Sequence, residues 1–215
     1  MSAIPRLRAG DRLVLASHNR GKLAEFRELF APFNLELISA ADLELPEPEE
    51  TGTTFAENAR IKAHAAAKAA NMLALSDDSG LCVDALGGDP GVYTANWAGP
   101  TRDFNHGMKR VEDALGAANA TTPGQRHGAF HATLCLAHPD GRDALYEGKI
   151  EGTLVWPPRG DIGFGFDPVF MPQGFDITFG EMPSSMKHGW APGQTGLSHR
   201  ARAFAKFVEG QIEQA

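Results

Sequence analysis

Stretches of apolar residues with strand-like and helical spacing alternate along the first third of the chain. Residues 12–17 form an apolar run typical of a strand, and Phe26 and Leu29 then fall on one face of a helix. A second short apolar run covers residues 35–39. Residues 54–70 follow it and are rich in alanine, which has the highest helix propensity. The predicted order is therefore strand, helix, strand, helix.

The second half of the chain predicts an antiparallel ribbon followed by a helix. Residues 126–138 and 144–155 both have the character of strands, and the Asp-Gly pair at 140–141 is a hairpin-turn signal. Residues 104–118 have helical apolar spacing before this ribbon. A terminal helix is expected after Ser198, because serine is a favoured N-cap.

An acidic stretch between two apolar runs carries the most distinctive chemistry. Asp77 and Asp78 are adjacent and are followed by Ser79 and Gly80. Adjacent carboxylates repel each other unless solvent, a cation or hydrogen-bond donors offset their charge. The stretch fits either a polar turn between two strands or a site for a hard cation such as Mg²⁺.

Composition and charge narrow the function classes. The chain has 215 residues with 42% hydrophobic and 22% charged residues, ordinary values for a soluble α/β protein. A net charge of −7 argues against broad nucleic-acid binding. No apolar run is long enough for a membrane span or a signal peptide, so no membrane association and a cytoplasmic location are expected. Cys82 and Cys135 lack partners at ligand spacing and are predicted to be buried, reduced thiols.

Cations stand where predicted helices begin, which the helix dipole disfavours. Lys22 starts the first helix, and His199 and Arg200 start the last. A bound phosphate would offset the conflict at Lys22, although an ordinary strand–helix turn with a solvated lysine is the simpler alternative. The loop before that helix consists of Ser17, His18, Asn19, Arg20, Gly21 and Lys22.

Aromatic residues interleaved with glycines follow the ribbon. The segment contains Phe164, Gly165, Phe166 and Asp167. A ring that stacks and a carboxylate that reads a base edge would suit a base pocket, and a buried strand with glycine bulges is the alternative. Together with Lys22, Glu50, Asp77 and Asp78, this segment supplies the parts needed to hydrolyse a nucleoside triphosphate.

Six of these motifs, in the same order, resemble the inosine/xanthosine triphosphate pyrophosphatases, the Ham1/RdgB-like enzymes that remove non-canonical purine nucleotides. The motifs lie between residues 12 and 208 at 17–22, 55–63, 76–84, 85–91, 163–168 and 198–200. The resemblance implies an elongated α/β fold with a long central mixed β-sheet and flanking helices. It also implies a single domain over residues 1–215, with two lobes that enclose the cleft, and a homodimer. The implied reaction is Mg²⁺-dependent release of pyrophosphate from ITP, dITP or XTP.

The resemblance also implies roles for individual residues. Asp78 would activate water and hold the metal with Glu50, while Asp77 would help to shape the site. The triphosphate would contact the Ser17–Lys22 loop, Lys62 and Ser79. The base would lie in the slot formed by residues 164–167, closed by Lys187, His199 and Arg200.

Two alternative functions stay open on the sequence. A non-catalytic module that binds modified nucleotides would bind tightly without turnover, but it would gain little from acids beside phosphates. A Maf-like pyrophosphatase for pyrimidine or other modified nucleotides would share the fold class. The segment at 163–168 and the Ser-His-Arg motif at 198–200 favour the purine substrate.

Overall fold

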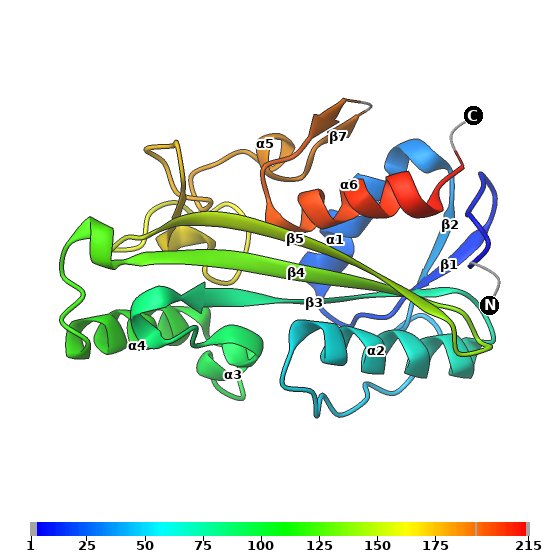
Figure 1. Ribbon diagram of the computed structural model, residues 1–215, viewed down its shortest axis with the longest axis horizontal. Coiled ribbons are helices and arrows are strands. Elements are labelled where there is room, and N and C mark those ends of the chain that lie inside the picture. Colours follow the sequence, from blue (N-terminus) through cyan, green and yellow to red (C-terminus); the bar gives the residue numbers. More distant parts are fainter. Residues whose placement is uncertain (1–3, 192, 214–215) are drawn as a thin grey trace.

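A six-stranded mixed sheet forms the centre of the protein (Figure 1). The computed structural model describes residues 4–191 and 193–213. The strand order is β2-β1-β3-β4-β5-β6, in which β1 is parallel to β2 and β3 and the remaining pairs are antiparallel. The strands are β1 (Arg12–Leu15), β2 (Glu36–Ser39), β3 (Ala74–Val83), β4 (His127–Ala137), β5 (Asp143–Leu154) and β6 (Phe170–Pro172).

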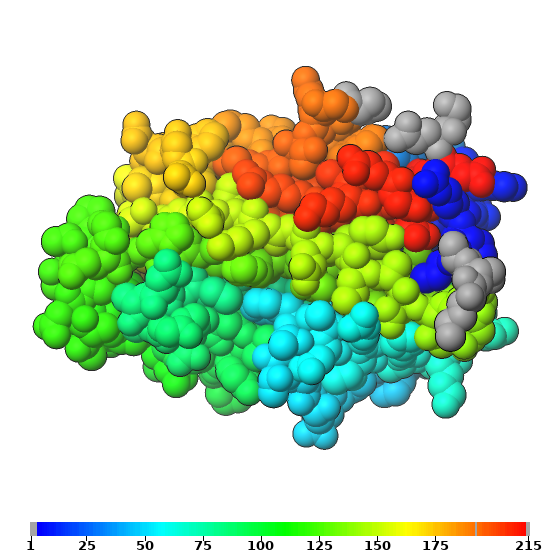
Figure 2. Space-filling view, viewed as in Figure 1, coloured from blue at the N-terminus to red at the C-terminus, as the bar shows by residue number. Residues whose placement is uncertain are grey.

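Helices cover both faces of this sheet (Figure 1). α1 and α6 lie on one face, whereas α2, α3 and α4 lie on the other. In the space-filling view, parts of β4 and β5 stay visible between α6 and α2 (Figure 2). The helices are α1 (Arg20–Phe30), α2 (Phe55–Ala70), α3 (Thr94–Trp97), α4 (Phe104–Ala117), α5 (Ser184–His188) and α6 (His199–Gln211). Among the described residues, none of these helices has the length and apolarity needed to cross a bilayer.

The predicted α/β fold with a mixed sheet and flanking helices is confirmed. The Asp140-Gly141 turn joins β4 and β5 in an antiparallel pair, and Ser198 caps α6 by accepting a hydrogen bond from the Ala201 N–H. Both cysteines are free, but only Cys135 is fully buried, since Cys82 is half-buried.

The polar turn considered for residues 77–80 is wrong. β3 runs without a break from Ala74 to Val83, and each of its residues is paired with β4. Successive side chains of a strand point to opposite faces of the sheet, so Asp77 and Asp78 are separated by the strand itself. The repulsion between the two carboxylates is therefore reduced without a bend in the chain.

Three clusters of apolar side chains make up the core. Phe30 packs edge-on against Phe204 and Phe207, which joins α1 to α6. The small alanines of α2 allow that helix to lie close against β3 and β4. The end of α6 is tied back to the start of the chain, because Leu7 and Ile212 form a β-bridge. The third cluster packs α4 and the segment around Phe166 against the far end of the sheet.

Gly148 in β5 lies where the backbone of α6 packs closely against the sheet. A Cβ there would lie 2.1 Å from the His199 carbonyl oxygen and 2.4 Å from the Ala203 nitrogen, both backbone atoms of α6. We expect Gly148→Ala to lower the free energy of unfolding by about 2 kcal/mol or more, because the helix must move. Urea denaturation measures this change.

Gly116→Ala in α4 is the matched control. Gly116 is exposed, and a Cβ there meets nothing within 4 Å. The same substitution should raise stability by about 0.5 to 1 kcal/mol through helix propensity. Equal effects at the two positions would contradict the close packing of α6 on β5.

Candidate active site

An open strand edge creates the site. β1 pairs with β3 only at Ala74 and Leu75, after which the chain turns away into the loop that leads to α1. The edge of β3 beyond these residues faces a cavity of about 880 Å³, and Asp77 to Gly80 contribute to its wall. The open edge ends at Leu81, whose N–H donates to the Thr94 hydroxyl. Side chains from both faces of β3 can therefore reach one cavity.

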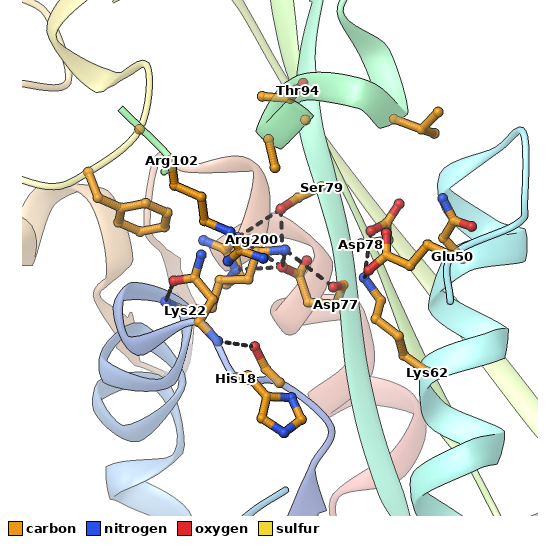
Figure 3. Close-up of a pocket in the computed structure, with 18 of the residues that line it drawn as sticks. His18, Lys22, Glu50, Lys62, Asp77, Asp78, Ser79, Thr94, Arg102 and Arg200 are labelled. Atoms are coloured by element: carbon orange, nitrogen blue, oxygen red, sulfur yellow. Dashed lines mark hydrogen bonds and ion pairs between the residues drawn. The ribbon is translucent and has the colours of Figure 1, made fainter. Parts of the chain in front are cut away.

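On one face of β3, Asp77 is held by two cations. Lys22 Nζ and Arg200 Nη2 each lie 2.9 Å from Asp77 Oδ2, and the Ser79 hydroxyl donates to the same oxygen (Figure 3). Arg200 also pairs with Glu25 from α1. Burial alone would raise the pKa of Asp77, but the charges of Arg200 and Lys22 hold it well below its usual range. Asp77 is therefore an ionised anchor that joins β3, α1 and α6.

On the other face, Asp78 and Glu50 share one lysine. Lys62 Nζ lies 2.6 Å from Asp78 Oδ1 and 2.9 Å from Glu50 Oε1 (Figure 3). Burial raises the pKa of Asp78 and outweighs the attraction of Lys62. At Lys62 burial would lower the pKa, but the two carboxylates outweigh it and raise the pKa. Asp78 Oδ2 is buried and accepts no hydrogen bond from the described residues, so it is available to a ligand.

The Ser17–Lys22 loop lies beside Asp77, and part of it lines the cavity. Asn19 caps α1 by accepting a hydrogen bond from the Lys22 N–H at 3.1 Å. Ser17, His18, Asn19 and Lys22 line the cavity. Arg20 is exposed and lies outside the cavity lining, and Gly21, also outside it, packs against the Phe164 ring. The cation at the helix start is thus offset by Asp77 within the protein, and no phosphate is needed to explain it.

Some residues of the segment at 164–167 are exposed to the cavity, whereas others are buried in the core. Phe166 lines the cavity but is 2% exposed and packs edge-on against Phe104, whereas Phe164 and Gly165 keep partial exposure at the cavity. Asp167 Oδ2 lies 3.0 Å from Lys187 Nζ. Burial raises the pKa of Asp167 to about 6 despite this lysine. Phe164 is therefore the ring of this segment best placed to contact a base.

His199 and Arg200, which the sequence placed at the base slot, are buried at the start of α6. The His199 ring stacks on Phe130 with centroids 4.9 Å apart, and burial holds its pKa well below the ordinary value, so the imidazole is neutral. The Arg200 side chain is 2% exposed and is paired with Asp77 and Glu25. Both residues line the cavity from the start of α6.

Two cavity residues had no clear signal in the sequence. Glu25 lies on the buried face of α1 and neutralises Arg200, and an acid at an apolar helix position was the only hint of this role. Arg102 lies in the loop before α4, just beyond the glycine- and proline-rich stretch at 87–100, whose length indicated a functional loop without singling out this arginine.

Comparison with known proteins places the chain in one family. The Ham1 family matches residues 13–210. A dITP/XTP pyrophosphatase of Mesorhizobium japonicum is 61% identical over 208 residues, covering 95% of this chain and 94% of that protein. The corresponding protein of Brucella melitensis is 59% identical over the same shares of the two chains. The solved structure of a HAM1 protein from Coxiella burnetii superposes with a TM-score of 0.80 at 34% identity, covering 93% of this chain and 97% of that one. The chain belongs to the Ham1 family.

Proposed function

We propose that the protein hydrolyses non-canonical purine nucleoside triphosphates (dITP, XTP and ITP) to the monophosphate and pyrophosphate. The names of its relatives support the substrate class. The environment of Asp78 is the main support for this reaction. Its buried carboxylate lies beside an 880 Å³ cavity, is oriented by Lys62 and has one oxygen without a hydrogen-bond partner among the described residues. A pure binding module would have no use for such a carboxylate beside the phosphates.

Asp78 and Glu50 are the residues suited to hold Mg²⁺. No group of three or more His, Cys, Asp or Glu side chains suited to a metal occurs in the described parts of the chain. Mg²⁺ commonly binds through one or two carboxylates together with substrate phosphates and water, so this pair is sufficient. When bound, the ion would neutralise negative charge on the triphosphate.

The protein's own residues supply the proton transfer. Asp78 accepts the proton of the water that attacks the α-phosphorus in line with the departing pyrophosphate. Burial raises the pKa of Asp78, which makes its carboxylate a stronger base than an exposed aspartate. Lys62 fixes one carboxylate oxygen at 2.6 Å and leaves the other without a partner in the described protein, so that this oxygen could accept the proton.

Asp167 and Phe164 are suited to select the base. A 6-oxopurine presents an N1–H donor next to an O6 acceptor, whereas adenine presents the opposite pattern. The Asp167 carboxylate would accept the N1–H, and adenine would leave it unpaired. A site that requires a hydrogen bond can discriminate by about 10⁴ or more.

The first test is release of pyrophosphate from a panel of nucleotides. We expect turnover of ITP, dITP and XTP to exceed that of ATP by at least ~10²-fold in kcat/KM. Removal of divalent ions with EDTA should abolish turnover, and added Mg²⁺ should restore it. Comparable hydrolysis of ATP would contradict the purine selectivity, and tight binding without hydrolysis would favour a binding module.

The second test separates the two adjacent aspartates. Asp78→Asn should lower kcat by about 10²- to 10⁴-fold while largely preserving stability, because Lys62 keeps Glu50 as a partner. Asp77→Asn should lower the free energy of unfolding by about 3 to 5 kcal/mol, because it leaves buried cations undercompensated. Steady-state kinetics and urea denaturation of both variants measure these effects. Asp113→Asn, at an exposed pair on α4, is the control and should change neither quantity. Normal turnover by Asp78→Asn would show that another group activates water.

The third test uses the titration of Asp167. Its folded pKa of about 6 lies above the ordinary value of 3.8, so the carboxyl is protonated below about pH 6 and is then a weaker acceptor of the N1–H. The KM for ITP should therefore rise as the pH falls through 6, and Asp167→Asn should remove this dependence. The contribution of Asp167 to the free energy of unfolding has the opposite pH dependence. Because the folded protein binds this proton more tightly than the unfolded chain does, the contribution is present at low pH and is lost as the pH rises through 6. A KM that is independent of pH in the native protein would remove Asp167 from base recognition.

A further inference from the structure

The cations that line the cavity are neutralised within the protein, with one exception. Lys22 and Arg200 pair with Asp77, Lys62 pairs with Asp78, and Lys187 pairs with Asp167. Among the lysines and arginines that line the cavity in the described chain, Arg102 alone has no carboxylate partner. Acidic side chains also outnumber these cations in the lining, so a triphosphate meets little free positive charge there.

The backbone at Arg102 is held in a conformation that favours glycine. Its φ is 53°, in the left-handed region. The turn is fixed by a hydrogen bond from the Arg102 N–H to the Gly99 carbonyl at 3.0 Å and from the Asp103 N–H to the Ala98 carbonyl at 2.9 Å. Asp103 then caps α4 by accepting from the Asn105 and His106 N–H groups. A non-glycine residue in such a conformation is unfavourable and is often found at functional sites.

The side chain of Arg102 is directed into the cavity. Figure 3 shows it extending from the loop toward the part of the site that contains Ser79, Lys22 and Arg200. A guanidinium is the side chain best suited to bind phosphate oxygens in a bidentate manner. The terminal phosphates carry most of the charge of a triphosphate, and charge also develops on the departing pyrophosphate.

We propose that Arg102 binds the β- and γ-phosphates of the substrate and stabilises pyrophosphate as it leaves. This inference rests on the proposed function, because it assigns the unpaired cation of the cavity to the leaving group of that reaction. The paired cations would then mainly organise the site, while Arg102 contributes charge to the ligand itself.

The test compares three substitutions of Arg102 with a matched loss of charge on α4. Arg102→Gln and Arg102→Gly both remove the charge, and glycine also suits the left-handed backbone, so the second variant should fold at least as well as the native protein. Arg102→Lys retains a charge without the bidentate geometry. Lys109→Gln is the control, since Lys109 is exposed and pairs only with Asp113.

Kinetics with ITP and Mg²⁺ should show kcat/KM lowered about 10- to 100-fold by Arg102→Gln and Arg102→Gly, the range expected for a hydrogen-bonded charge. Arg102→Lys should recover part of this loss. The constant for inhibition by pyrophosphate should rise about tenfold or more in the two neutral variants. The constant for inosine monophosphate should change less than about twofold, because the monophosphate lacks the groups assigned to Arg102.

Direct titration with pyrophosphate and Mg²⁺ by calorimetry separates this inference from the proposed function. Native protein that fails to hydrolyse ITP would contradict the proposed function, yet weaker pyrophosphate binding by the neutral variants would still support Arg102. Unchanged pyrophosphate binding in these variants would overturn the inference. A loss of affinity for inosine monophosphate alone would overturn it as well, because Arg102 would then contact the nucleoside end.

Discussion

The alternation of side chains along β3 is the constraint on which the site depends. One unbroken strand carries Asp77 to one face and Asp78 to the other, so that two adjacent carboxylates have separate surroundings. Each keeps one buried oxygen without a hydrogen-bond partner among the described residues, but Lys22 and Arg200 hold Asp77, whereas Lys62 alone pairs with Asp78. This division works only because β1 stops pairing at Leu75 and leaves the edge of β3 open to the cavity.

Ion pairs hold the surrounding elements in register around that strand. Arg200 connects α6 to β3 through Asp77 and to α1 through Glu25. Lys62 connects α2 to β3 and to the acidic loop that carries Glu50. A buried pair whose partners come from distant parts of the chain fixes geometry more than it adds stability, because desolvation offsets much of its attraction. The site is therefore preorganised largely by charge.

Local signals in the sequence predicted most of the fold, and the family resemblance added cavity residues such as Lys62 and Ser79, but neither predicted the electrostatics of the cavity. Helical periodicity, the Asp140-Gly141 turn and the Ser198 cap depend on neighbouring residues, and the structure confirms them. The partner of Arg200 is 123 positions away, so no local pattern could show that a carboxylate offsets this cation. The alternative of a polar turn at residues 77–80 is wrong for a related reason, since charges alone do not reveal which face of a strand each side chain occupies. The sequence did not indicate Arg102, because its positive φ is set by the turn and not by its own residue type.

The position of α6 has a consequence for the order in which the site is completed during synthesis. The strand β3, Lys22 and Lys62 all leave the ribosome well before residue 199, but Asp77 receives its guanidinium only with α6. In a nascent chain that ends before this helix, Asp77 has Lys22 but not Arg200 as a partner, and α1 lacks the aromatic contacts with Phe204 and Phe207. The apolar cluster between α1 and α6 and the ion pairs of Asp77 are therefore completed by the same late segment.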